Sequence, residues 1–597
     1  MSKLQCEPGR LAPRLGMILP RLLSRGLLEC QFEVKLSLCA VLALWIEATI
    51  ASATTPVSFN KDIAPIVFEN CASCHRPGES GPFPLLSYND VKKRARQIAE
   101  VTEKRYMPPW LPDGPHGQFV GDRRLSREQI ELFRQWYDAG TPEGPGDLPP
   151  MPHWPGGWHL GDPDLVVQMA QPFILAAEGR DVYRNFVLPV ALSQTRYVRA
   201  VEFRANNPRI VHHAFIKVDY LGRVHLLDGA DGEPGFAGMN LPEGVKMPSG
   251  YFLSYQPGKL PSSEAAGYGW TLKSGQDLVL QAHLRPSGKP EQLKAQVGLF
   301  FTETPPTTIT LLLSLGSLNI DIPAGTNTWV LEDSFLLPVP VTLLSVLPHA
   351  HYLGKCLEAF ACLPDGSQRQ LLNIPDWDFN WQGDYRYTNP IRLPAGSGLR
   401  MRFVYDNSEA NPRNPNHPPK EVMYGPQSSD EMAECWFQVQ LSSTNDEVQL
   451  SRAYDQKERQ ILTEHAQSLL QRDPHDARAR TELGFLHWTD GKVDQAVQLF
   501  HAACADDPTY DQPHYYLGVI YREQNRLVAA RAEFEIAVRL NRDNPKSLTN
   551  LALVFLGLGN LDRAERSIRE AVRLDPTDGL ARETLDNILQ MRNKGKP

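Results

Sequence analysis

The stretch LPHAHYLGK occupies residues 347–355 and carries His349 and His351 with one residue between them. Successive side chains of a β-strand point to opposite faces, so histidines at this spacing share one face and can hold a metal ion together. From about residue 162 to 441 the chain shows short runs rich in β-branched and aromatic residues, separated by turn residues. This pattern predicts antiparallel β-sandwiches, with LPHAHYLGK in one of them.

Three further segments of this region offer metal ligands: His212-His213, His283 in the predicted strand DLVLQAH, and Met432 after Asp430-Glu431. Adjacent strand residues point to opposite faces, so His212 and His213 need a strand end or a bulge to converge. A lone methionine is more often a core residue than a ligand. The candidates form a three-histidine set (His212, His213, His283) and a His-x-His set (His349, His351, Met432). Imidazole with thioether suits copper, whereas zinc more often takes carboxylate or thiolate.

The order of these motifs, ending in SSDEM at 428–432, resembles the copper type II, ascorbate-dependent monooxygenases. That family includes peptidylglycine α-hydroxylating monooxygenase and dopamine β-monooxygenase, and the similarity spans about 280 residues. The resemblance implies two jelly-roll-like β-sandwich domains, with one copper ion in each, facing across an open cleft. It also implies O2-dependent hydroxylation of a C–H bond.

The resemblance assigns a role to each set. It implies that the three-histidine set holds a copper that stores an electron, and that the His-x-His set holds the catalytic copper that binds O2 and the substrate. Gln281 matches a glutamine that the family carries on the same strand as the histidine at 283.

Three departures from the family leave the substrate open. The peptide-hydroxylating branch has a substrate-binding arginine where this chain has Leu347, and a tyrosine where it has Trp436. The family's cysteine follows the methionine directly, whereas Cys435 lies three residues after Met432.

A second cofactor motif, CASCH at residues 71–75, precedes the β-rich region. Two cysteines, two spacers and a histidine form the signature of covalent c-type haem, with Cys71 and Cys74 as the thioether residues and His75 as the proximal ligand. Its alternatives are a zinc site or a redox pair. A methionine is the usual opposite ligand in electron-transfer cytochromes, which favours Met107, with His116 as the alternative.

The sequence around this motif predicts three helices, over residues 62–70, about 90–104 and from Ser126 onward. Ser126 and Gln129 form a capping box at the start of the third. Three short helices around CxxCH resemble a compact cytochrome c.

The first residues have the features of an export signal. Arginines precede the apolar run 36–53, which ends in Ala51-Ser52-Ala53, so we expect cleavage after Ala53. An uncleaved membrane anchor is the alternative, although Glu47 interrupts the run. Either way we expect a periplasmic or otherwise exported protein, in which disulfides can form. The pairing of Cys356, Cys362, Cys435 and Cys504 is left open.

Residues 477–578 repeat with a period of 34. The recurring positions are Leu483-Gly484, Leu517-Gly518 and Leu551-Ala552; Ala496, Ala530 and Ala564; Ala503, Ala537 and Ala571; and Phe500, Phe534 and Ile568. This resembles tetratricopeptide repeats, in which small residues allow paired helices to approach closely. Flanking helices are expected at about 453–471 and 579–591. Such solenoids usually bind protein segments.

The complete prediction is a multidomain chain with a helical cytochrome c domain, two antiparallel β-sandwich copper domains and a helical repeat solenoid. Its expected parts are the leader (1–53), haem domain (54–145), linker (146–160), sandwiches (161–302 and 303–450) and repeats (451–597). The net charge of −8 and the lack of a long basic run argue against nucleic acid as a partner.

The predicted function is an exported oxidoreductase that uses haem c and two copper ions to oxidise an unknown organic substrate with O2. Electrons would come through the haem domain from a redox partner protein, or from an external reductant such as ascorbate. One alternative is a non-catalytic haem and copper protein that transfers electrons or stores metal. The other is a scaffold in which the repeats recruit a protein partner, and a membrane is expected only if the leader is uncleaved.

Overall fold

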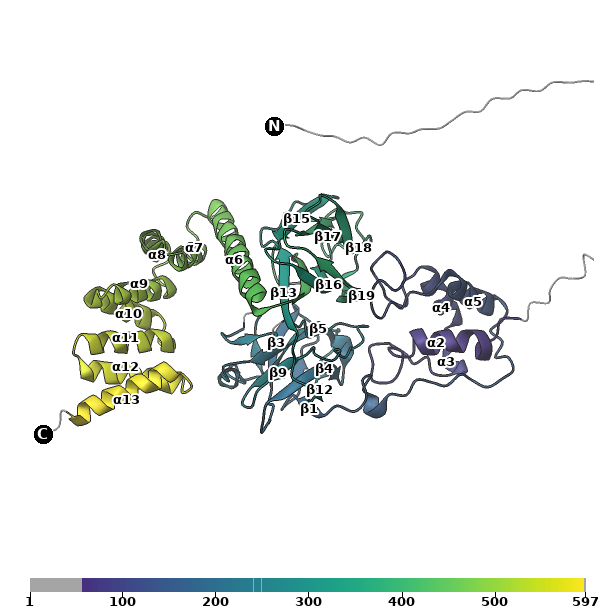
Figure 1. Cartoon of the computed structure of the whole chain (residues 1–597), viewed down its shortest axis with the longest axis horizontal. Helices are drawn as coiled ribbons and strands as arrows, with labels where there is room; N and C mark the ends of the chain where they lie inside the picture. The colour runs from purple at the N-terminus through teal and green to yellow at the C-terminus, as the bar shows by residue number, and fades with distance from the viewer. Residues whose placement is uncertain (1–55, 240, 249, 595–597) are drawn as a thin grey trace, which may run out of the picture. The chain divides into compact units, whose positions relative to one another are not determined.

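The computed structural model describes residues 56–239, 241–248 and 250–594. The predicted leader, residues 1–53, lies outside them. The described residues from Val57 onward belong to one compact unit. Along this part of the chain, short helices are followed by antiparallel sheets and then by paired helices (Figure 1). Among the helices of the described residues, none is both long and apolar enough to cross a membrane.

A π-helical turn, Phe59–Ile63, opens the first domain. Its helices are α2 (Ala64–Asn70), α3 (Tyr88–Lys92), α4 (Ala95–Glu103) and α5 (Arg127–Asp138). The predicted capping box at Ser126 and Gln129 is confirmed. The single helix predicted over 90–104 is wrong, because the backbone leaves helical geometry at Arg94 and separates α3 from α4.

The loop between α4 and α5 joins the first domain to the second sandwich. The amide of Val120 donates to the carbonyl of Arg386 at 2.8 Å. The amide of Thr388 donates to the carbonyl of Gln118 at 3.0 Å. Phe119 is buried in the core of that sandwich. The segment that carries Met107 therefore continues into a different domain, which the predicted boundary at 145 did not anticipate.

The first sandwich has two main antiparallel sheets. One has the order β1 (Leu165–Gln168), β12 (Ala295–Thr302), β4 (Arg196–Ala205), β9 (Trp270–Leu272). The other has the order β6 (Phe236–Ala237), β3 (Val182–Leu188), β10 (Asp277–Leu284), β5 (Val211–Asp219), β7 (Val245–Lys246), with β8 (Ser254–Tyr255) also on β5. A short pair, β2 (Phe173–Leu175) and β11 (Glu291–Leu293), completes it.

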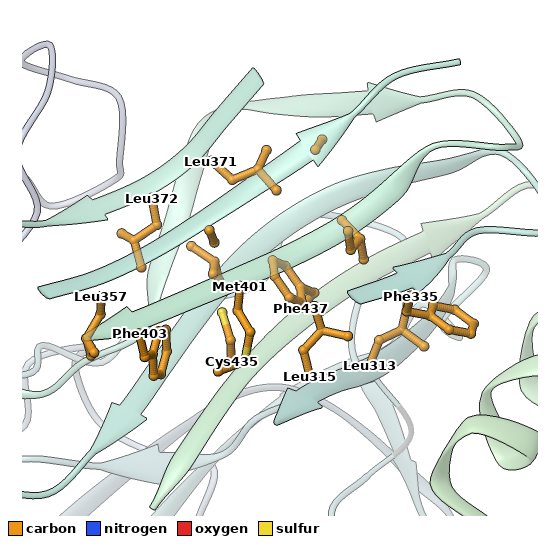
Figure 2. Close-up of a cluster of buried hydrophobic side chains, with 14 of the residues drawn as sticks. Leu313, Leu315, Phe335, Leu357, Leu371, Leu372, Met401, Phe403, Cys435 and Phe437 are labelled. Atoms are coloured by element: carbon orange, nitrogen blue, oxygen red, sulfur yellow. The ribbon is translucent and has the colours of Figure 1, made fainter. Parts of the chain in front are cut away.

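The second sandwich is also antiparallel. Its sheets have the orders β13 (Ile309–Gly316), β22 (Ala433–Leu441), β16 (Val341–Ala350), β19 (Tyr385–Leu393), and β15 (Trp329–Leu336), β20 (Gly398–Tyr405), β17 (Gly354–Cys362), β18 (Gln368–Ile374). A short pair, β14 (Asp321–Ile322) and β21 (Val422–Met423), lies beside them. Figure 2 shows side chains of both sheets meeting between the layers, among them Leu315 and Phe437 from one and Met401 and Phe403 from the other. The prediction of a β-rich region built of antiparallel sheets is thus confirmed.

Helix α6 (Thr444–Arg472) begins earlier than the helix predicted at 453–471. Its first half packs on the second sandwich, where Leu450 joins the core and the hydroxyl of Tyr454 accepts from the amide of Ser314 at 2.8 Å. The predicted boundary at 450/451 therefore falls inside a helix.

Paired helices follow: α7 (Ala477–Thr489), α8 (Val493–Asp506), α9 (Gln512–Glu523), α10 (Leu527–Leu540), α11 (Pro545–Gly557), α12 (Leu561–Leu574) and α13 (Gly579–Lys594). The recurring alanines and the rings of Phe500 and Phe534 are fully buried, which confirms the 34-residue phase. A Cβ on Gly518 would lie 2.7 Å from the ring of Phe534, so only glycine permits this close approach.

Candidate functional site

The three-histidine set is assembled within one sheet. His213 on β5 is paired in register with His283 on β10. The next pair joins Leu284 to Val211, so His212 is the extra residue of a β-bulge. A strand end or a bulge was expected for His212 and His213 to converge, and the structure has a bulge. One ring nitrogen from each of the three buried histidines lies within 4.8 Å of the others, an arrangement that could hold a metal ion.

Neighbouring polar groups orient His283. Its Nε2 lies 2.9 Å from a carboxylate oxygen of Asp181, and its Nδ1 lies 3.2 Å from the hydroxyl of Tyr183. Burial disfavours the ionised form of Asp181, but hydrogen bonds from His283 and Ser428 outweigh it and lower the pKa of this carboxyl to about 2. A carboxylate that holds one imidazole nitrogen is a common support for a metal ligand.

The two histidines of the His-x-His set lie at the end of β16. The Nδ1 of His349 lies 2.7 Å from Oε1 of Gln382, and the Nδ1 of His351 lies 3.0 Å from the carbonyl oxygen of Asp430. Their ring centroids are 5.2 Å apart. In each ring a hydrogen bond fixes Nδ1, so Nε2 is the nitrogen left for a metal ion.

Met432 belongs to the loop that holds His351. It is 6 % exposed, its carbonyl accepts from the hydroxyl of Tyr405 at 2.8 Å, and it lies two residues after Asp430. Its role as the third ligand stays a prediction. The buried carboxylate of Glu431 joins this loop to the segment that follows β16, because it accepts from the amides of His351, Leu353 and Met432. Burial raises the pKa of Glu431 to about 8, although these amides act against the shift.

The two sets touch each other, which differs from the open cleft that the resemblance implied. The ring centroids of His213 and His349 are 6.2 Å apart. The amide of Gln382 bridges them, since its Nε2 lies 3.5 Å from Nδ1 of His213. Phe379 packs between the sets, with its ring centroid 4.3 Å from that of His212 and 5.0 Å from that of His351. A further link is the hydrogen bond from Ser428 to Asp181.

Burial keeps the imidazoles of His212, His213 and His351 neutral. It lowers the pKa of His212 and His213 well below the ordinary histidine value, and neighbouring imidazoles act in the same direction. It lowers the pKa of His351 to about 3. Only a neutral imidazole has a lone pair available for a metal ion.

Two ring nitrogens support the fit of this cluster to a metal. Within the described part of the chain, Nε2 of His212 and Nε2 of His351 are buried without a hydrogen-bond partner. Buried polar atoms are normally paired, so each such atom calls for an explanation. Imidazole donors with a nearby methionine fit copper better than they fit a hard cation.

The residues of the CxxCH motif line a separate cavity of about 370 Å³, which we call the cysteine cavity. Cys71, Cys74, His75 and Met107 all contribute to its wall. His116 is not among the described residues that line it, and its side chain is 63 % exposed beside Asp122. The geometry thus brings Met107, and not His116, together with the motif.

The cysteine cavity has the features expected of a haem site. The Nδ1 of His75 lies 3.0 Å from the carbonyl oxygen of Phe83, which leaves its Nε2 for iron. A Cβ on Gly81 would lie 2.6 Å from the carbonyl oxygen of Cys74, so only glycine fits at this position. Nε of Arg123 and Nε1 of Trp381 line the cavity without a hydrogen-bond partner among the described residues. Such donors suit the carboxylates of a haem.

The six described cysteines, Cys71, Cys74, Cys356, Cys362, Cys435 and Cys504, are free thiols. Gln281, which the resemblance singled out, donates to Asn185 at 3.1 Å and accepts from Lys217 at 3.1 Å. It therefore takes part in a polar network on the strand that carries His283.

Sequence reasoning missed several residues of the cluster. Asp181, Phe379 and Gln382 belong to no motif, and Gln382 is 169 positions from His213. The aromatic run DFNWQ at 378–382 is the one signal that could have drawn attention to them.

Comparison with known proteins concerns the C-terminal region. The tetratricopeptide repeat family model matches residues 464–511 and 515–579. No curated protein matches the chain. Among solved structures, the chain is similar to the first tetratricopeptide domain of Spaghetti (RPAP3) bound to an HSP90 peptide, at 22 % identity and a TM-score of 0.20, covering 20 % of this chain and 96 % of that one. The predicted repeats are confirmed by the family model, and residues 464–579 are tetratricopeptide repeats.

Proposed function

We propose that the chain is an exported oxidoreductase that uses covalent haem c and two copper ions, and that it hydroxylates a C–H bond of an organic substrate with O2. The observation that carries this proposal is the convergence of five histidines from two sandwiches, with His213 and His349 only 6.2 Å apart between ring centroids. Four of them, His212, His213, His283 and His351, are buried, and a purely structural role would not need so many buried imidazoles at one interface.

The residues around the cluster prepare it for metal binding. Asp181 holds Nε2 of His283, the Asp430 carbonyl holds Nδ1 of His351, and Gln382 holds Nδ1 of His349. These contacts fix each ring before an ion arrives, which lowers the cost of ordering the site. When bound, the copper ions would supply one-electron redox chemistry and the reduction of O2.

The cysteine cavity supports an electron-transfer role for the haem. Cys71 and Cys74 would hold the haem through thioether bonds, and His75 and Met107 would be its iron ligands. With a histidine and a thioether as ligands, a haem would supply electron-transfer chemistry, because the thioether favours the ferrous state. The haem would therefore deliver electrons, and the oxidation would take place at the histidine cluster.

The proposal can be tested on the full-length chain, produced by export in a host that attaches haem c. We expect one haem and two copper ions per chain, and O2 uptake that depends on a substrate found by screening organic compounds. H351A should abolish that uptake, whereas H501A, in helix α8 of the repeats, should leave it unchanged. Haem and copper without substrate-dependent O2 uptake would instead support a non-catalytic electron-transfer protein, and absence of both groups would refute the proposal.

A second candidate function is recruitment of a protein partner, which is favoured by the match to the tetratricopeptide repeat model. Phe485 of α7 is 38 % exposed and stands in an aromatic group with Trp488 and Tyr516, so it is a candidate contact. A photo-crosslinker at Phe485 should capture one partner reproducibly, whereas a crosslinker at the exposed Leu336 of β15 should not. Equal labelling from both positions would contradict this function.

A further inference from the structure

We propose that the turn Phe379–Trp381, together with Gln382, is the electron-transfer bridge between the cysteine cavity and the histidine cluster. This inference rests on the proposed function, because it needs a haem in the cavity and copper at the histidines. It goes beyond that function by naming the residues that carry the electron and the point at which it enters the cluster.

Trp381 forms the end of the bridge at the cavity. Although it belongs to the second sandwich, its side chain lines the cavity together with His75 and Met107. Its ring meets that of Tyr106 edge-on, with centroids 5.8 Å apart. Its Nε1 is buried and has no partner among the residues that the structure describes. The indole is thus placed where it would contact a haem edge.

Gln382 forms the end of the bridge at the cluster. Its Oε1 lies 2.7 Å from Nδ1 of His349, and its Nε2 lies 3.5 Å from Nδ1 of His213. One amide therefore reaches a ligand candidate of each set. Because the contact with His349 is the shorter, the geometry assigns the entry point of the electron to His349 of the His-x-His set.

The bridge is short and held in place. Trp381 and Gln382 are adjacent, so their Cα atoms are about 3.8 Å apart. The amide of Trp381 donates to the carbonyl of Asp378 at 2.9 Å, and the carboxylate of Asp378 accepts from the amide of Asn380 at 2.9 Å. Arg413 donates to the carbonyl of Trp377 at 2.9 Å just before the turn. A fixed path through bonded atoms and one hydrogen bond suits transfer of an electron between two centres.

The transfer is a single one-electron step. One electron leaves ferrous haem, which becomes ferric, and enters a Cu(II) ion, which becomes Cu(I). No covalent bond forms or breaks, and no proton needs to cross the bridge. An external one-electron reductant restores the ferrous haem.

The test is intramolecular electron transfer in the full-length, haem- and copper-loaded protein. A photochemical reductant delivers one electron to the haem, and haem absorbance and the Cu(II) electron paramagnetic resonance signal are followed. We expect haem reoxidation with matching loss of Cu(II) signal in the wild type. This phase should be lost in W381L and Q382L, slowed in W381F, and unchanged in W154L, which removes an indole that stacks on Arg76 outside the cavity wall.

Each variant is first checked for haem spectrum, haem potential and copper content, so that loss of a cofactor is not mistaken for loss of the path. Wild-type rates in W381L and Q382L with both cofactors retained would overturn the bridge and leave the proposed function standing. A wild-type protein that binds both cofactors but shows no transfer from haem to copper would overturn the bridge and the electron-supply role of the haem together. Absence of either cofactor from the wild type would refute the proposed function itself.

Discussion

The histidine cluster and the helical repeats are assembled over very different distances along the chain. In the repeats, the ring of Phe534 packs against Gly518 of the preceding helix, and Phe500 packs against Gly484 in the same way. In the cluster, Gln382 reaches His213 across 169 positions, and Ser428 reaches Asp181 across 247. The repeats thus stack neighbouring units, whereas the cluster depends on the docking of two domains.

The two regions also differ in what they bury. Each repeat buries alanines and large apolar rings, which is the ordinary source of stability. The cluster buries imidazoles with unpaired nitrogens, which cost free energy unless a ligand satisfies them. Burial therefore stabilises the repeats and prepares the cluster for binding. Four changes test this contrast.

The largest effect should follow from H213A. His213 contacts both sets, so its loss should remove the ion of the three-histidine set and weaken the other. Copper per chain, measured by mass spectrometry of the metal, should fall from two ions to one or fewer. H475A, at an exposed histidine of the repeats, is the control and should keep both ions. Full copper content in H213A would show that the sets do not depend on this residue.

In the repeats, F534A should destabilise strongly without affecting metal. The ring is fully buried, and removing a buried phenylalanine costs about 3–5 kcal/mol. Chemical denaturation followed by circular dichroism should show an earlier unfolding transition of the helices. Copper and haem content should stay at the wild-type level, and loss of either would mean that the repeats support the cluster.

Next to the cluster, K217M should stabilise the protein. Burial lowers the pKa of Lys217 to about 8, although Glu434 acts against the shift. Since the unfolded chain then binds more protons than the folded one between about pH 8 and 10.5, wild-type stability should rise with pH across this window. Below about pH 8, burying the charged Lys217 costs about 3 kcal/mol of stability, and K217M should remove this cost.

Denaturation at several pH values checks this prediction. The advantage of K217M should be largest at pH 7 and should shrink as the pH approaches 10.5. K289M, at an exposed lysine beside Glu291, should show no such trend. A K217M variant less stable than the wild type at pH 7 would show that its hydrogen bond to Gln281 outweighs the cost of burial.

The smallest of the four effects is expected for S428A, which removes one link between the sandwiches. A hydrogen bond to a charged group contributes about 1.5–3 kcal/mol, so thermal stability should fall by that order. S408A removes a comparable hydrogen bond, to Asp406, within the second sandwich. If domain docking matters for metal binding, copper affinity should fall in S428A and stay unchanged in S408A.

The sequence by itself determined the regular parts of this protein. The 34-residue phase, the capping box at Ser126 and the antiparallel strands were all predictable, because each depends on a pattern that repeats over a few residues or at a fixed interval. The same alternation required a strand end or a bulge for His212 and His213 to converge, and left open which of the two occurs. The spacing of His349 and His351 showed which face they share, but not which residues they meet.

Only the tertiary structure decided how the sites are related. The contact between the two histidine sets, the position of Gln382 between them and the entry of Phe119 into the second sandwich each join segments far apart in the chain. Each such contact occurs once, so it produces no repeating pattern in the sequence. It forms because two domains bury surface against each other, and that outcome depends on the shape of both.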